Sequence, residues 1–186
     1  MIEIRLHGRG GQGTVVAAKI LADAVSREGK FVQAFPEYGV ERRGAPVKAF
    51  LRIADEIIYI KSEIYEPDHL VILEPSLIGA IDLIYGLKEG GWIIINTNKD
   101  PEEMEFAGNY RIATVPATKI ARKFHLGSEA APIVNTAILG GVVKVLDLCD
   151  LETLKEAVKE GVPLKEEANL KASEEAFNET KGGNNA

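Results

Sequence analysis

Cysteine is almost absent from this chain, which contains only Cys149 among its 186 residues. One thiol cannot form an internal disulfide, a structural zinc site or an iron–sulfur cluster, because each of these needs several ligands from the chain. Any cluster that works together with this protein therefore has to be bound by another chain. We expect Cys149 to be inert and partly buried, since free cysteine packs as a small apolar residue.

The sequence also lacks a long apolar segment and an excess of positive charge. No run approaches the roughly 20 apolar residues that span a bilayer. Glu3 and Arg5 interrupt the first segment, which is therefore unlike a signal peptide. The net charge is −6, which is unfavourable for binding a nucleic-acid backbone. We predict a cytoplasmic protein that binds neither membranes nor nucleic acids.

No complete catalytic motif is present either. The chain has no G-x-S-x-G elbow, no H-E-x-x-H pair, no P-loop and no obvious pair of carboxylates. This absence of a full catalytic set indicates a subunit that works with other chains. The chain does have 46% hydrophobic and 27% charged residues, as is typical of a globular fold.

Segments with strand and helix patterns alternate along the chain. They predict an α/β fold with an open, mostly parallel, Rossmann-like sheet flanked by helices and a helical C-terminal portion. A helix is predicted from Thr14 to a stop at Gly29, and a crossover helix over 76–87. Strands are predicted at 2–7, 31–35, 47–53, 70–73, 92–95 and 111–115, with a further short strand at 57–60.

The last third of the chain is predicted to be helical. Helices are expected at 118–124, at 133–146 with Pro132 in the first turn, and after Asp150, which can cap a helix that ends near Gly161. Residues 164–181 are highly charged and predict a helical arm or a partner-facing segment, followed by a frayed tail at 182–186. We therefore place the main domain at 1–162 and the charged arm and tail at 163–186.

A glycine-rich loop follows the first predicted strand. Gly8, Gly10 and Gly13 match G-x-G-x-x-G and open the first helix, as in dinucleotide-binding folds. Glycines permit tight turns, and the free N–H groups at a helix start attract phosphate, to which Arg9 can add a positive charge. In the alternative interpretation, the glycines only make the turn from strand to helix.

The loop fits an NAD site imperfectly. Such a site needs an acidic residue about 20 positions further on, for the ribose. Glu28 has that spacing but lies at a helix end, whereas Glu37 follows the second strand late, after Pro36. Gly11 and Gln12 also make the loop unlike the usual NAD form. A stand-alone NAD-dependent oxidoreductase is therefore the alternative hypothesis.

A second loop at 35–46 contains two prolines, two glycines and four charged residues. In a doubly wound sheet it should lie near the glycine loop, because both follow carboxyl ends of strands. Arg42 or Arg43 can hold a phosphate or a carboxylate through paired hydrogen bonds. The alternative is a solvated turn in which Glu41 pairs with one of these arginines.

Five other residues carry expectations. His7 ends the first strand beside the glycine loop. It can orient a ligand or the loop itself, but we expect a structural role. Asn135 and Thr136 lie early in a helix and can either face a ligand or make a capping or core hydrogen bond. Gly140 and Gly141 lower helix propensity, which predicts that another backbone approaches closely there.

Three segments together resemble the gamma subunit of 2-oxoacid:ferredoxin oxidoreductases: 1–13 with the glycine loop, the loop at 35–46, and 132–140. Within this family, the gamma chain of the pyruvate and 2-oxoisovalerate enzymes is the most similar. The resemblance extends to about Gly161, and its most specific part is the stretch 41–46 beside the glycine loop.

The resemblance implies a complex that cleaves a 2-oxoacid, with pyruvate as the expected substrate, and transfers the acyl group to coenzyme A while electrons pass to ferredoxin. Thiamine diphosphate, magnesium and [4Fe–4S] clusters would lie on the alpha, beta and delta subunits, and this chain would be inactive alone. A gamma subunit in isolation should expose apolar surface. The other hypothesis is an interaction module whose glycine loop is unused. The resemblance implies that coenzyme A approaches Gly8, Arg9, Gly10, Gly11, Gln12, Gly13, Glu37, Tyr38, Arg42, Arg43, Asn135 and Thr136.

Overall fold

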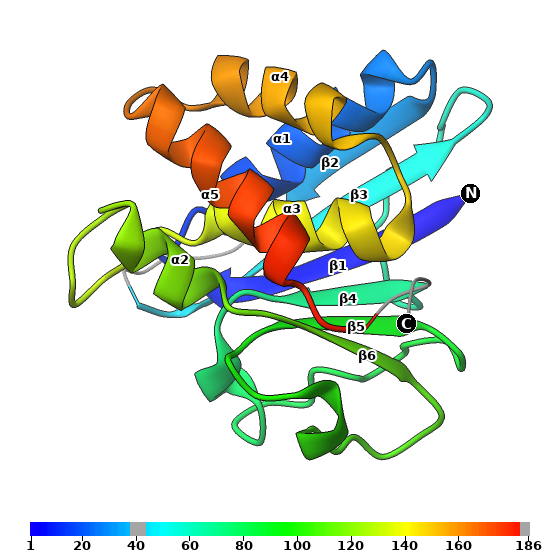
Figure 1. Cartoon of the computed structure of the whole chain (residues 1–186). Coiled ribbons are helices and arrows are strands. Elements are labelled where there is room, and N and C mark those ends of the chain that lie inside the picture. Colours follow the sequence, from blue (N-terminus) through cyan, green and yellow to red (C-terminus); the bar gives the residue numbers. More distant parts are fainter. Residues whose placement is uncertain (38–43, 183–186) are drawn as a thin grey trace.

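The structure is a computed structural model that describes residues 1–37 and 44–182. Its strands belong to one sheet, and helices follow or connect them (Figure 1). The elements are β1 (Ile2–Arg9), α1 (Thr14–Arg27), β2 (Phe31–Pro36), β3 (Pro46–Ala54), β4 (His69–Ile72), the 3-10 helix η1 (Pro75–Leu77), β5 (Trp92–Asn96), the 3-10 helix η2 (Pro101–Glu103), β6 (Arg111–Val115), α2 (Ala117–Lys123), α3 (Asn135–Leu146), α4 (Leu151–Gly161) and α5 (Glu166–Glu179).

The sheet is open and has the strand order β2-β3-β1-β4-β5-β6. β1, β4, β5 and β6 run parallel, whereas β3 is antiparallel to both of its neighbours, β1 and β2. This confirms the predicted α/β class with a mostly parallel sheet. β1 is longer than predicted, because Gly8 and Arg9 still pair with Val47 and Pro46 of β3.

The continuous apolar runs form the central strands. In β5, Trp92 and Ile94 pack into one core, and Ile93 and Ile95 pack into a second core on the opposite face of the sheet. All of β5 is buried. Burial on both faces explains why its sequence is uniformly apolar rather than alternating.

All five α-helices cover one face of the sheet (Figure 1). Their apolar stripes meet in the larger core, to which every one of them contributes. Asp150 caps α4, as predicted, by accepting a hydrogen bond from the Thr153 N–H at 2.6 Å. α3 begins at Asn135 rather than at 133, because Pro132 pairs with Gly127 in a β-bridge ahead of the helix.

Within residues 1–37 and 44–182 the opposite face of the sheet is covered without an α-helix, so the predicted crossover helix over 76–87 is wrong. That segment forms only η1 and then irregular turns, in which Leu77, Leu83 and Leu87 are buried. Gly79 and Gly86 have φ angles of 80° and 74°, which break a helix of L-residues. The strand predicted at 57–60 is also wrong, because these residues lie outside the sheet.

The charged C-terminal segment is helical and packs against the body. α5 lies on α3, and a Cβ added to Gly140 would approach the Ser173 backbone oxygen to 1.9 Å. This confirms the close backbone approach predicted at Gly140. After α5, the chain pairs with β6 through a bridge between Lys181 and Thr114. The domain division at residue 162 stays a prediction. Of the frayed tail predicted at 182–186, residues 183–186 lie outside the described residues.

Candidate functional site

The glycine loop lies at the carboxyl edge of the parallel strands, between β1 and α1. Gly11 and Gly13 have φ angles of 101° and 81°, which only glycine adopts without strain. A Cβ at Gly13 would lie 2.6 Å from Asn135 Nδ2, and one at Gly8 would lie 2.1 Å from Thr14 Oγ1. The glycines therefore serve both backbone geometry and the close packing of the loop on α1 and α3.

The described end of the second loop, residues 44–46, lies beside the glycine loop, as predicted from the sheet topology. The Gly10 N–H donates to the Ala45 oxygen at 2.9 Å, and the Gly44 N–H donates to the Gly10 oxygen at 3.3 Å. Arg9 adds a third link, since its Nη1 donates to the Gly44 oxygen at 2.9 Å. The described end of the second loop is thus fixed to the glycine loop by three hydrogen bonds.

Residues after β4 complete this edge, and the sequence analysis did not single them out. Gln12 Nε2 donates to the Glu74 carboxylate at 2.5 Å, and Arg9 donates to Ser76 Oγ at 3.2 and 3.4 Å. Burial alone would raise the pKa of Glu74, but hydrogen bonds from Ser76 and Gln12 and the charge of Arg9 lower it overall. Glu74 is therefore an anionic anchor that holds Gln12, and through it the loop, in place.

A cavity of about 430 Å³ opens beside the glycine loop. Its wall joins the loop and the start of α1 to the segment before α3 and to the α4–α5 connection. Most of the wall is apolar, and Asn135, Asn169 and Lys165 are its polar members. The other lining residues are Gly11, Gly13, Val16, Leu126, Gly127, Ile133, Val162, Pro163 and Leu164.

Asn135 and Thr136 have different environments. Asn135 lies on the cavity wall against Gly13, and its Oδ1 accepts a hydrogen bond from the Thr136 N–H at 2.8 Å. Thr136 is fully buried and donates from Oγ1 to Asn169 Oδ1 at 2.7 Å. Thr136 is therefore not on the cavity wall, and it fixes α3 to α5, while only Asn135 faces the space beside the loop.

Glu37 lies at the carboxyl end of β2, and its carboxylate accepts a hydrogen bond from Lys48 Nζ at 2.7 Å. β3 separates β2 from β1, so Glu37 is two strands away from the strand that carries the glycine loop. In a dinucleotide-binding fold the ribose acid follows the strand beside the first one. Tyr38, Arg42 and Arg43, predicted as ligand-facing, lie outside the described residues.

His7 is buried at the end of β1 and takes a structural role, as expected. Arg5 Nε donates to His7 Nε2 at 3.0 Å, while His7 Nδ1 has no partner within the described part of the chain. Burial, followed by the charges of Arg5 and Lys48, lowers the pKa of His7 to about 3. The ring is therefore neutral at physiological pH and unsuited to proton transfer there.

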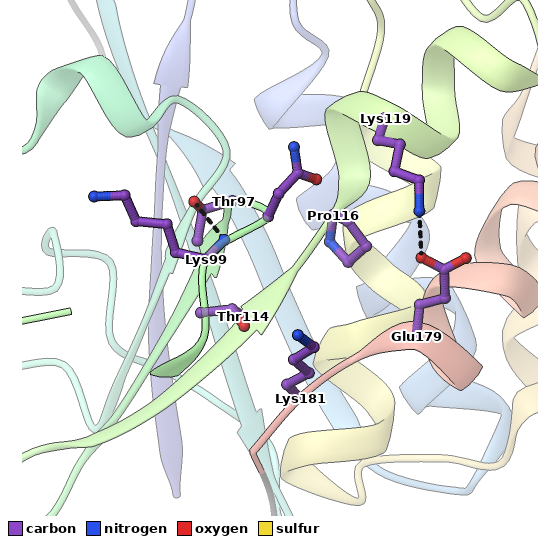
Figure 2. A pocket seen from close by; sticks show the side chains of 8 residues that line it. Thr97, Lys99, Thr114, Pro116, Lys119, Glu179 and Lys181 are labelled. Atoms are coloured by element: carbon purple, nitrogen blue, oxygen red, sulfur yellow. Dashed lines mark hydrogen bonds and ion pairs between the residues drawn. The ribbon is translucent and has the colours of Figure 1, made fainter. Parts of the chain in front are cut away.

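A second, polar cavity of about 210 Å³ lies at the ends of β5 and β6 (Figure 2). Two of its three lysines are neutralised: Lys119 pairs with Glu179 at 3.2 Å, and Lys181 pairs with Asp100. The pairing reduces its attraction for an anion. The glycine-loop cavity is therefore the stronger candidate site.

Residues 1–37 and 44–182 contain neither a metal-binding cluster nor a membrane-spanning helix. Within those ranges no three His, Cys, Asp or Glu side chains gather as a metal site would require, and no helix there is long and apolar enough to cross a membrane. Cys149 is partly buried, as predicted, and burial raises its pKa to about 12; its inertness stays a prediction. Fold and site together define an α/β protein with a glycine loop and an adjoining cavity at the carboxyl edge of its sheet.

The comparisons with known proteins identify the family. The model of the pyruvate ferredoxin/flavodoxin oxidoreductase family matches residues 3–179. The pyruvate/ketoisovalerate oxidoreductases common subunit gamma of Thermococcus kodakarensis is 55% identical, over 97% of either chain. The chain belongs to the pyruvate ferredoxin/flavodoxin oxidoreductase family, which confirms the resemblance found in the sequence.

Solved structures agree with this assignment. The pyruvate oxidoreductase subunit PORC of Thermotoga maritima superposes with a TM-score of 0.81 at 37% identity, over 97% of both chains. The fold also occurs in a 2-oxoglutarate:ferredoxin oxidoreductase of Magnetococcus marinus, solved with 2-oxoglutarate, coenzyme A and succinyl-CoA bound. That match has a TM-score of 0.72 at 20% identity and covers 30% of the longer chain.

Proposed function

We propose that this chain is the gamma subunit of a 2-oxoacid:ferredoxin oxidoreductase, with pyruvate as the expected substrate, and that its glycine-loop edge binds coenzyme A. The observation that carries the proposal is the loop itself, which opens α1 beside an apolar cavity of about 430 Å³. Coenzyme A has phosphates at one end and a long, weakly polar arm. A helix N-terminus suits the phosphates, and an apolar cavity with a few polar groups suits the arm.

Arg9 is the residue that we expect to contribute most to phosphate binding. Its guanidinium group has no carboxylate within ion-pair distance among the described residues, and it is oriented by Gly44 and Ser76. An arginine held in this way keeps its positive charge available to a ligand. Gln12 and Glu74 hold the loop conformation, and Asn135 offers an amide on the wall of the cavity.

The remaining cofactors belong to the partners in this proposal. A single cysteine cannot hold a [4Fe–4S] cluster, and the described ranges contain no metal-ligand cluster. The residues of this chain therefore do not fit the clusters. We assign the clusters, thiamine diphosphate and magnesium to the alpha, beta and delta subunits, from which electrons pass to ferredoxin. The described residues suit a supporting role, and the chain is not expected to be active alone.

A kinetic experiment on the assembled complex tests the proposal. The tagged chain is expressed in its native host and purified anaerobically with its partners, and reduction of a viologen dye by pyruvate is measured at varied coenzyme A. Arg9→Gln should raise the KM for coenzyme A about tenfold and leave the KM for pyruvate unchanged. A change of about tenfold corresponds to the binding free energy that one charge-assisted hydrogen bond contributes.

Arg122→Gln is the matched control. Arg122 is half-exposed on α2 and pairs with Glu129 at 3.7 Å, and it is not one of the residues that line the glycine-loop cavity. Both kinetic constants should stay at the wild-type values in this variant. An unchanged KM for coenzyme A in Arg9→Gln would contradict the binding role. Purification of the chain alone, without larger partners or cluster absorbance, would contradict the subunit assignment.

A further inference from the structure

Large apolar side chains are exposed on the face of the sheet opposite the α-helices of Figure 1. They come from the two irregular segments 55–66 and 78–86, which follow β3 and η1. Tyr59, Tyr85 and Tyr65 are 81%, 69% and 64% exposed, although tyrosine normally buries much of its ring. The aromatic surface, as we name it, consists of Ile57, Tyr59, Ile60, Tyr65, Ile81 and Tyr85.

Two buried arginines hold these segments against the sheet. Arg5 of β1 donates from Nη2 to the Leu83 and Tyr85 oxygens at 2.9 and 2.7 Å. Arg52 of β3 donates to the Ile60 and Glu63 oxygens at 3.5 and 3.3 Å. The backbone carbonyls thus point towards the sheet, while the exposed side chains of Tyr85 and Ile60 lie on the outer side.

The two segments also contact each other. A Cβ added to Gly86 would lie 2.0 Å from the Tyr65 oxygen, so the backbones of the two segments touch at this point. The Lys88 N–H donates to the Pro67 oxygen at 3.1 Å. Tyr65 and Tyr85 therefore belong to one continuous, fixed surface rather than to two independent loops.

Burying a guanidinium group is costly, and both buried groups direct part of their hydrogen bonding to these segments. Arg52 also pairs with Glu3 at 2.7 Å and donates to Gln33 at 3.0 Å within the sheet. Arg5 and Arg52 are 6% and 1% exposed, and removing such a charge from water costs several kcal/mol unless it is fully hydrogen-bonded. Rigid, pre-positioned aromatic side chains bind a partner with little loss of conformational entropy. The arrangement is thus typical of an interface that is formed before its partner arrives.

The charges around the aromatic surface are mostly negative. The two segments contain five carboxylates and one lysine. Four of these carboxylates form no ion pair within the described ranges. They are Glu56, Glu63, Glu66 and Asp82.

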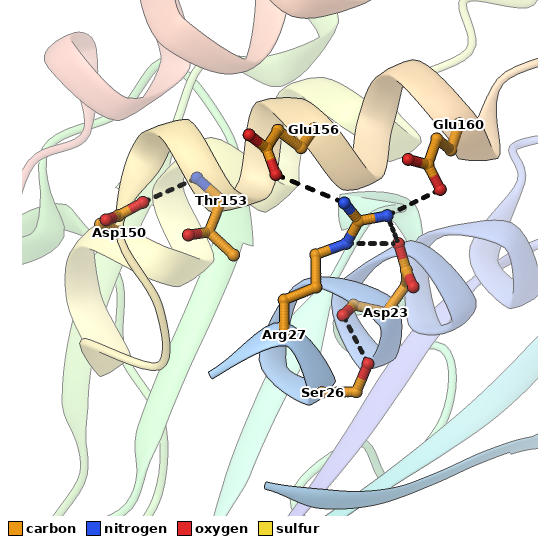
Figure 3. A network of polar contacts seen from close by, with 7 residues as sticks. All are labelled: Asp23, Ser26, Arg27, Asp150, Thr153, Glu156 and Glu160. Atoms are coloured by element: carbon orange, nitrogen blue, oxygen red, sulfur yellow. Dashed lines mark hydrogen bonds and ion pairs between the residues drawn. The ribbon is translucent and has the colours of Figure 1, made fainter. Parts of the chain in front are cut away.

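Charges on the helical face behave differently (Figure 3). There Arg27 binds Asp23 at 2.8 Å, Glu160 at 2.7 Å and Glu156 at 3.4 Å, so the acidic groups of α1 and α4 are paired within the chain. The rim of the aromatic surface is therefore an acidic region that is available to an external cation.

We infer that the aromatic surface docks a different subunit of the same complex, one with an apolar contact patch rimmed by lysine and arginine. This inference rests on the proposed function. A second copy of this chain fits poorly, because a two-fold contact would place the acidic rim against itself, and like charges across an interface are repulsive. A specific interface usually has an apolar centre and a polar rim whose charges complement those of the partner.

Binding of the labelled full-length chain to the remaining subunits, purified together without gamma, tests this inference. Tyr59→Ala and Tyr85→Ala should each raise the dissociation constant about tenfold, because the loss of a central aromatic side chain weakens an interface by this order. Tyr85→Phe, which keeps the ring, should restore most of the affinity. Glu63→Lys combined with Glu66→Lys should slow association, and this effect should shrink at high salt.

Glu152→Lys combined with Glu156→Lys on α4 is the matched control, since it makes the same charge reversal on the helical face. These side chains are 77% and 69% exposed, and binding should stay within about twofold of wild type. Thermal unfolding of every variant checks that the fold is retained.

Three results would overturn the inference: wild-type affinity in both tyrosine variants, an equal loss in the α4 control, or a homodimer that buries the aromatic surface. If the wild-type chain binds none of the other subunits, the proposed function fails as well. Normal binding of the wild type together with insensitive tyrosine variants would reject the surface and leave the subunit function standing.

Discussion

His7 should make the stability of this protein depend on pH in a way that one substitution removes. The ring is 1% exposed and accepts a hydrogen bond from Arg5 Nε at 3.0 Å. Burial, then the charges of Arg5 and Lys48, lowers its pKa from 6.5 to about 3. Between these values the unfolded chain holds one proton more than the folded chain. Stability is therefore fully present above pH 6.5 and falls on acidification towards pH 3.

The size of this effect follows from the two pKa values. Each pH unit within the window is worth about 1.4 kcal/mol, so acidification from pH 7 to pH 5 removes about 2 kcal/mol. His7→Gln keeps an acceptor for Arg5 Nε but cannot be protonated, and it should lack this loss. Urea unfolding of both proteins at pH 7 and pH 5 measures the difference, because contributions from carboxylates are common to the two chains.

Equal losses in wild type and His7→Gln between those pH values would refute the reasoning. They would mean that the folded protein accommodates a charged His7, with the pKa of the ring near its ordinary value. A larger loss in His7→Gln would refute it as well, since it would assign the acid sensitivity to other groups. The starting stability at pH 7 does not enter the comparison, because only the change with pH is used.

Other substitutions probe the packing of the loop, the helices and the thiol. Gly13→Ala should cost about 2 kcal/mol, because its φ angle of 81° strains alanine and the methyl group would meet Asn135 at 2.6 Å; adding Asn135→Ala should recover part of this loss in a double-mutant cycle. Gly140→Ala should cost about 3 kcal/mol in thermal unfolding, since the methyl group would lie 1.9 Å from the Ser173 oxygen. Cys149, with its pKa raised to about 12 by burial, should react with iodoacetamide at pH 8 about 100-fold more slowly in the folded than in the urea-unfolded chain.

Most strands of the sheet could be predicted from the sequence, but the irregular layer that covers the face opposite the α-helices could not. Continuous apolar runs such as 92–95 have one solution, a strand buried on both faces, and the structure confirms it. The segment 76–87 is periodic enough in its apolar residues to predict a helix. Its outcome depends on Gly79 and Gly86, whose positive φ angles allow turns, and on donors from Arg5, which is far away in sequence.

The candidate site was predictable to a similar extent. The G-x-G-x-x-G spacing located the loop, and the carboxyl-edge argument predicted 35–46 beside it. The hydrogen bond between Gly10 and Ala45 confirms this for the described end of that segment. Glu74 and Ser76 could not be found in this way, since their role depends on β4 lying next to β1. The signal that could have found them is their position directly after a buried strand, where polar side chains reach the same edge.

The fold separates the two surfaces on which the proposals rest. The glycine loop and its cavity lie at the carboxyl edge under the helical layer, with Asn135 of α3 on the cavity wall. The aromatic surface lies on the other face of the sheet, fixed there by Arg5 and Arg52. A ligand at the carboxyl edge and a partner on the opposite face therefore need not compete for the same residues. A subunit built in this way can stay attached to its complex by one face while the carboxyl edge remains open to a ligand that must enter and leave in every turnover.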